Sequence, residues 1–144
     1  VEWRDVEAPE LEIGKAEKLT EGSEVAIIAI GPVVNLAQKA AAEYPGKVSV
    51  YDFKFLKPFD VDSLKEIVSK HKHIITVEDG CLKGGLYGEV CESVMGYDYQ
   101  GSIEGLGIPD EFIKHARQSD QNAKCGINLA GIEKSLKKYF ASKK

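Results

Sequence analysis

Apolar residues along this chain fall into short continuous runs that are separated by stripes of helical spacing. The first run, residues 25–30, is rich in β-branched residues and has no polar position, a pattern typical of a strand buried on both faces of a parallel sheet. Residues 48–53, 73–77 and 102–106 predict three further strands. A shorter stretch at 13–19 predicts a fifth strand at the edge of the sheet.

Segments whose apolar residues recur at helical spacing follow the predicted buried strands. Pro32 suits the first turn of a helix because its missing N–H would have no partner there, and Asp60 or Asp62 is expected to cap the next helix. The expected helical segments are residues 33–41, 64–68, 86–94, 120–125 and 129–140, with a helical turn at 110–115. Because strands and helices alternate, we expect an α/β fold: a mainly parallel five-stranded sheet with helices on both faces.

The composition favours one globular domain. The 144 residues are 43% hydrophobic and 29% charged, and the net charge of −4 argues against a nucleic-acid-binding protein. No apolar run approaches the roughly 18 residues that span a bilayer, and the acidic start is unlike a secretory leader, so we expect no membrane partner and a cytoplasmic location. The three cysteines form no CxxC pair, so neither a disulfide framework nor a tetrahedral zinc site is predicted.

The candidate site lies in the loop after the third buried strand, predicted at residues 78–85. In open α/β sheets, ligands bind beyond the carboxyl ends of the strands, where helix N-termini present free N–H groups. Gly84 and Gly85, with Gly88 in the next helix, permit close backbone approach and predict a possible anion or regulatory loop. The alternative is a glycine turn that only docks the helix, since the spacing is neither GxGxxG nor that of a P-loop.

Two acidic residues begin this loop. Glu78 and Asp79 are adjacent, so their side chains are expected to point in opposite directions, and they form no obvious acid/base couple. A structural role is favoured, either accepting backbone N–H groups or pairing with Lys57 or Lys83.

Other polar side chains give no complete catalytic set. His71 and His73 are expected to be exposed at the start of a strand, and His115 is interpreted as a solvated helix end, a cap or a polar contact surface. Cys81 is the thiol whose reactivity we would test. Because no Ser/His/Asp order, HExxH or Gly-Asp…Asn pattern is present, no catalytic and no metal-binding residue is predicted.

Several segments in order resemble one family, the transketolase-type enzymes that depend on thiamine diphosphate. The chain resembles their C-terminal domain at residues 14–17 (GKAE), 21–31 (EGSEVAIIAIG), 51–60 (YDFKFLKPFD) and 76–88 (TVEDGCLKGGLYG). Residues 107–115 (GIPDEFIKH) and the downstream GIN and AGI segments are most similar to one branch, the 1-deoxy-D-xylulose-5-phosphate synthases. Ala116 stands where many members have Gly, and Asp79 where many have Glu.

The resemblance implies a fold and a limited role. Such synthases condense pyruvate with glyceraldehyde 3-phosphate for isoprenoid precursors, and hold thiamine diphosphate and Mg²⁺ in their N-terminal and middle domains. The resemblance therefore implies that this fragment binds no cofactor and has no turnover of its own. It also implies a role in packing, homodimer support and possible regulation. The chain begins with Val1, and we interpret residues 1–12 as the linker from a missing middle domain and residues 13–144 as the domain. The alternative is a ligand- or partner-docking domain, such as that of a keto-acid dehydrogenase beta subunit.

Overall fold

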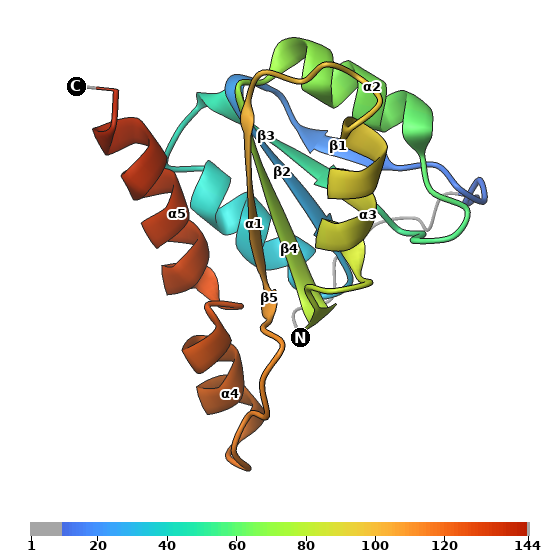
Figure 1. The fold of residues 1–144 in the computed structure, drawn as a ribbon. Coiled ribbons are helices and arrows are strands. Elements are labelled where there is room, and N and C mark those ends of the chain that lie inside the picture. Colours follow the sequence, from blue (N-terminus) through green and yellow to red (C-terminus); the bar gives the residue numbers. More distant parts are fainter. Residues whose placement is uncertain (1–9, 144) are drawn as a thin grey trace.

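Five strands form one sheet, in which all neighbours run parallel except at one edge (Figure 1). The computed structural model describes residues 10–143. The strands are β1 (Glu17–Thr20), β2 (Gly22–Ile30), β3 (Gly46–Asp52), β4 (His73–Cys81) and β5 (Ser102–Ile108). They lie in the order β1-β3-β2-β4-β5, with β1 antiparallel to β3. The mainly parallel five-stranded sheet and its short edge strand are thus confirmed.

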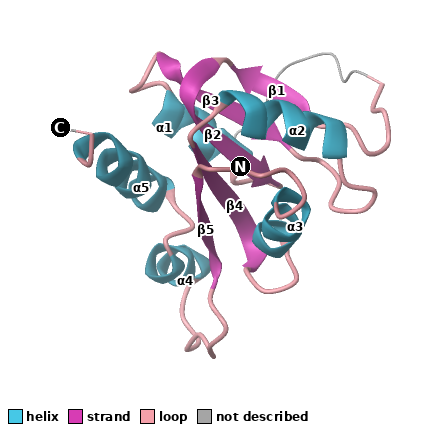
Figure 2. Ribbon diagram, turned by 45° about the horizontal axis from the view of Figure 1, so that its top comes forward, coloured by secondary structure: helices cyan, strands magenta, loops and turns pink. Residues whose placement is uncertain are grey.

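Helices cover both faces of this sheet (Figure 2). They are α1 (Val34–Ala41), α2 (Val61–Lys70), α3 (Leu86–Val94), α4 (Gln118–Cys125) and α5 (Leu129–Ala141). Buried side chains of α1 and α5 share one hydrophobic cluster with the sheet, and those of α2 and α3 share the other. The predicted two-sided cover is therefore confirmed.

The central strand β2 explains why its sequence carries an unbroken apolar run. Successive side chains of a strand point to opposite faces, so Val25, Ile27 and Ala29 join the cluster under α1 and α5. Ala26 and Ile28 join the cluster under α2 and α3. All five are completely buried, and a polar residue at any of them would lose its hydration without a partner.

Asp60 is the N-cap of α2, which decides between the two predicted capping residues. Its Oδ1 accepts the Ser63 N–H at 3.1 Å, and its Oδ2 accepts the Ala16 N–H at 2.8 Å. Burial pushes the pKa of Asp60 upward, but the hydrogen bonds from Ala16 and Ser63 outweigh it and hold that pKa below 3.8. One carboxylate thereby starts α2 and ties the segment before β1 to it.

Strand β4 is longer than the sequence pattern predicted. The expected loop at 78–85 is wrong in its first half, because β4 continues to Cys81. The neighbouring strand β5 runs on to Ile108 and supplies backbone partners there, as in the hydrogen bond from Leu82 N–H to the Ile108 carbonyl at 3.0 Å. A polar stretch can remain a strand where a neighbouring strand pairs with it.

His71 and His73 are buried, and the expectation that they are exposed is wrong. Only 3% of His71 and 6% of His73 is accessible to solvent. The His71 ring lies 2.9 Å from the Ser49 hydroxyl through Nε2 and 3.0 Å from the Ile67 carbonyl through Nδ1. Nε2 also lies 3.2 Å from the Gly22 carbonyl of β2. These contacts join β3 to the end of α2.

The buried ring of His73 leads to a pH-dependent stability. It stacks on Tyr139 of α5 at 4.7 Å between centroids, and its Nε2 lies 3.9 Å from the Glu104 carboxylate. Burial lowers the pKa of His73 below 6.5, although the charge of Glu104 opposes this effect. The unfolded chain therefore takes up this proton at a higher pH than the folded chain does.

We expect the free energy of unfolding to fall as the pH drops below 6.5, by at most about 1.4 kcal/mol per pH unit for this one proton. Urea unfolding at about pH 7.5 and about pH 5.5 measures the loss, and His73→Asn should make it smaller. The carboxylates with lowered pKa values, such as Glu24 and Glu66, titrate below 4.5 and so outside this window. An equal pH dependence in wild type and variant would contradict the assignment to His73.

The predicted linker at residues 1–12 falls mostly on residues 1–9, which lie outside the described part of the chain. The division into a linker and a domain therefore stays a prediction. Between residues 10 and 143, no helix is long and apolar enough to cross a membrane.

Candidate functional site

The glycine loop joins the end of β4 to the start of α3. Gly84 has a φ of +75°, in the left-handed region that other residues rarely adopt. Gly85 is the N-cap of α3, and the space that a Cβ would need is filled by the Glu78 carboxylate and the Cys81 carbonyl. Gly88 lies in the first turn of α3. The loop therefore needs its two adjacent glycines for different reasons: a positive φ and a close contact.

Glu78 supplies an anion to the N-terminus of α3. Its carboxylate is buried, with Oε2 accepting the Leu86 N–H at 2.8 Å and Oε1 accepting the Tyr87 N–H at 2.9 Å. Negative charge is stabilised there by the free N–H groups and the helix dipole. The prediction that Glu78 accepts backbone N–H groups is confirmed.

The anion or regulatory loop at Gly84, Gly85 and Gly88 stays a prediction. An external anion at this helix start would compete with the Glu78 carboxylate for the same N–H groups.

Lys83 links the glycine loop to the segment that follows β5. Its Nζ lies 2.6 Å from Oδ2 of Asp110, and both side chains are largely exposed. Exposed ion pairs contribute little stability, so this pair shows where the two loops lie close together at the carboxyl end of the sheet and is not what holds them there.

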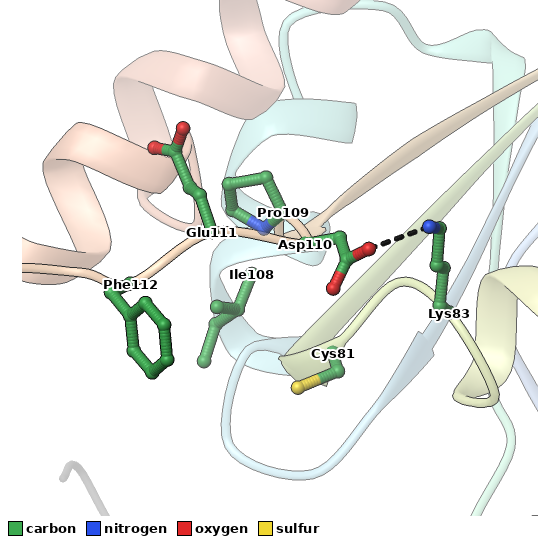
Figure 3. A pocket seen from close by; sticks show the side chains of 7 residues that line it. All are labelled: Cys81, Lys83, Ile108, Pro109, Asp110, Glu111 and Phe112. Carbon is green, nitrogen blue, oxygen red and sulfur yellow. Dashed lines mark hydrogen bonds and ion pairs between the residues drawn. The ribbon is translucent and has the colours of Figure 1, made fainter.

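A hollow opens between these two loops (Figure 3). Its volume is about 350 Å³. Its lining residues come from the ends of β4 and β5 and the segments after them: Cys81, Lys83, Ile108, Pro109, Asp110, Glu111 and Phe112. Figure 3 shows Ile108 and Phe112 on one side of the segment after β5 and Glu111 on the other. The hollow thus has an apolar wall with the Lys83–Asp110 pair at its rim.

The segment after β5 is not helical, so the predicted helical turn at 110–115 is wrong. Its local backbone bond is from Glu111 N–H to the Pro109 carbonyl, which does not begin a helical turn. Short helices depend on packing an apolar face. Here Ile113 turns toward α4 while Phe112 is fully exposed, at 103%, so the two adjacent apolar residues do not share a buried face.

The chemistry of the hollow favours contact over catalysis. Cys81 is free and exposed, but none of the lining residues is a histidine that could activate it. His115 lies outside the hollow and is exposed. Among residues 10–143, no group of three or more His, Cys, Asp or Glu side chains is placed to hold a metal ion.

Reasoning from the sequence selected the glycine loop and missed the apolar wall. Phe112 and Ile113 are adjacent bulky residues in a segment with no strong helical or strand period. That combination is the signal that could have pointed to a projecting loop, because neighbouring side chains in an irregular segment point in different directions.

A family model described as the transketolase C-terminal domain matches residues 14–132. The chain belongs to this family. The sheet, the glycine loop and the hollow all lie within the residues that match this transketolase C-terminal domain.

Curated relatives of this transketolase C-terminal domain are named as 1-deoxy-D-xylulose-5-phosphate synthases. The relative from Phocaeicola vulgatus is 39% identical over 140 residues, covering 94% of this chain and 22% of the relative. The relative from Porphyromonas gingivalis is 40% identical over 135 residues, covering 91% of this chain and 21% of the relative. The chain therefore spans about a fifth of the length of these relatives.

Solved structures show the same fold. A chain described as "Split gene transketolase, inactive beta4 tetramer" superposes with a TM-score of 0.81 at 27% identity, covering 94% of this chain and 46% of that one. A transketolase from Leishmania mexicana gives a TM-score of 0.60 at 20% identity, covering 85% of this chain and 17% of that one, which supports the fold alone.

Proposed function

We propose that this chain is the C-terminal domain of a 1-deoxy-D-xylulose-5-phosphate synthase, which condenses pyruvate with glyceraldehyde 3-phosphate for isoprenoid precursors. The observation that carries the proposal is the similarity to synthases of this name, at 34–40% identity over most of the chain. No observation favours the keto-acid dehydrogenase alternative.

The proposed role of this domain is packing and homodimer support. Thiamine diphosphate and Mg²⁺ would be held by other domains of the parent enzyme, and the described residues 10–143 offer no cluster suited to a metal ion. Strand β5 lies at the edge of the sheet, and such an edge can pair with another chain. We further infer a cytoplasmic location, supported by the three free cysteines.

The test compares residues 1–144 with the intact enzyme encoded by the same gene. We expect no thiamine diphosphate binding by residues 1–144 in calorimetry with Mg²⁺ present, because the resemblance places the cofactor in other domains. The intact enzyme should form 1-deoxy-D-xylulose 5-phosphate only when the cofactor is added. Tight cofactor binding by residues 1–144, or an intact enzyme without this activity, would contradict the proposal.

A further inference from the structure

Phe112 is a large apolar side chain that the described part of the chain leaves uncovered. Its exposure of 103% exceeds the 87% of Met95 and the values of the other exposed apolar residues between positions 10 and 143. Single apolar residues on a surface are common, so exposure alone does not mark a binding site. What distinguishes Phe112 is its surroundings.

Phe112 stands beside an apolar hollow with a polar rim. Ile108 and Pro109 form the wall next to it, and the pair of Lys83 and Asp110, 2.6 Å apart, lies at the rim (Figure 3). An aromatic anchor, an apolar centre and a charged rim are the features of a protein–protein interface. We call Phe112, Ile108, Pro109 and the neighbouring Cys81 the Phe112 platform.

The segment that carries Phe112 contacts α4 through the residues that follow Phe112. Ile113 lines a second, smaller hollow together with Gln121 and Cys125 of α4. The Gln121 side-chain amide also donates to the Lys114 carbonyl at 3.2 Å. Phe112 is therefore presented by a segment whose other side is attached to the domain, which reduces the ordering that docking would require.

The hollow does not suit a small polar ligand or a nucleic acid. Its lysine and the aspartate at its rim are exposed and already paired with each other, and the net charge of the chain is −4. An apolar protein surface is the occupant that this chemistry fits.

The length of the relatives indicates which protein surface covers the Phe112 platform. The chain covers 20–22% of the synthases to which it is similar, so most of each relative's polypeptide lies outside the match and is available in the same molecule. We propose that the Phe112 platform docks onto another domain of the same enzyme, which receives the Phe112 ring in an apolar pocket. This inference rests on the proposed function.

The test uses Cys81 as a reporter in the intact enzyme. Docking over the Phe112 platform should slow the alkylation of Cys81, and peptide mass spectrometry measures the rate of this alkylation. Phe112→Ala should raise the rate by about tenfold or more, because a central aromatic anchor carries much of an interface's binding energy. The half-buried Cys91 on α3 is the internal reference, since unfolding of a variant would expose both thiols. Phe112→Leu keeps an apolar side chain and should give a smaller increase.

Met95→Ala is the matched control, since it also removes an exposed apolar side chain but at the C-cap of α3. It should leave Cys81 alkylation unchanged. Fast alkylation of Cys81 in the wild-type enzyme, or equal effects of the two alanine variants, would overturn the docking. Protection of Cys81 that disappears on dilution would also overturn it, because it would indicate that a second copy of the enzyme covers the Phe112 platform. Synthase activity of the wild-type enzyme is measured separately, so loss of the proposed function is distinguishable from loss of docking.

Discussion

Glu78→Ala is expected to lower the free energy of unfolding by about 3 kcal/mol. The Glu78 carboxylate accepts the Leu86 and Tyr87 N–H groups at the start of α3, and removing it leaves both donors without an acceptor in a mostly buried place. A buried donor that loses its partner costs about 1–3 kcal/mol, and the helix also loses a favourable charge near its N-terminus. Urea unfolding followed by circular dichroism measures the change.

Two further variants separate these causes. Glu78→Gln keeps one side-chain oxygen and should lose roughly half as much stability, since one of the two N–H groups retains an acceptor. Asp79→Ala removes an exposed neighbour and should change stability by less than about 0.5 kcal/mol. If Glu78→Ala were as mild as Asp79→Ala, the bonds to α3 would not be stabilising the fold.

Gly85→Ala is expected to cost about 3 kcal/mol, at the upper end of the range for overpacking. A Cβ at Gly85 would overlap the Cys81 carbonyl and the Glu78 carboxylate, so backbone or a buried anion must move. Because the displaced carboxylate is the one that caps α3, the substitution should also weaken the bonds to Leu86 and Tyr87. Thermal and urea unfolding of the purified variant would show the loss.

The other two glycines of the loop provide matched comparisons. Gly84→Ala has open space for its Cβ but a φ of +75°, so it should cost only about 1–2 kcal/mol of backbone strain. Gly88→Ala would meet the Leu82 carbonyl at 3.5 Å, an ordinary contact, and should stabilise the helix by up to about 1 kcal/mol. The order Gly85, Gly84, Gly88 in decreasing cost is the expected result, and equal costs would refute the steric argument.

The fold could be predicted from the sequence because its strongest signals are local. Residues 25–29 of the first apolar run are completely buried, and glycines and prolines lie near the ends of most of the helices. The exceptions have non-local causes. β4 continues past Val77 to Cys81, where β5 pairs with it again through Ile108, and His73 is buried because α5 packs over it.

The candidate site was only half predictable for the same reason. The sequence predicted a structural role for Glu78, either accepting backbone N–H groups or pairing with a lysine, and the structure selects the backbone N–H groups of Leu86 and Tyr87. The hollow at Phe112 instead depends on how the ends of β4 and β5 meet, as in the hydrogen bond from Leu82 N–H to the Ile108 carbonyl. No local periodicity encodes that meeting.

The antiparallel strand β1 has a mechanical consequence. It brings the chain onto the sheet beside β3, whereas Phe112 follows β5 at the opposite edge. Five strands at a spacing of about 4.8 Å separate these edges by roughly 19 Å. A polypeptide covalently attached before β1 and a surface in contact with Phe112 would therefore hold the domain at two separate points. Two attachment points at opposite edges of the sheet restrict its rigid-body rotation.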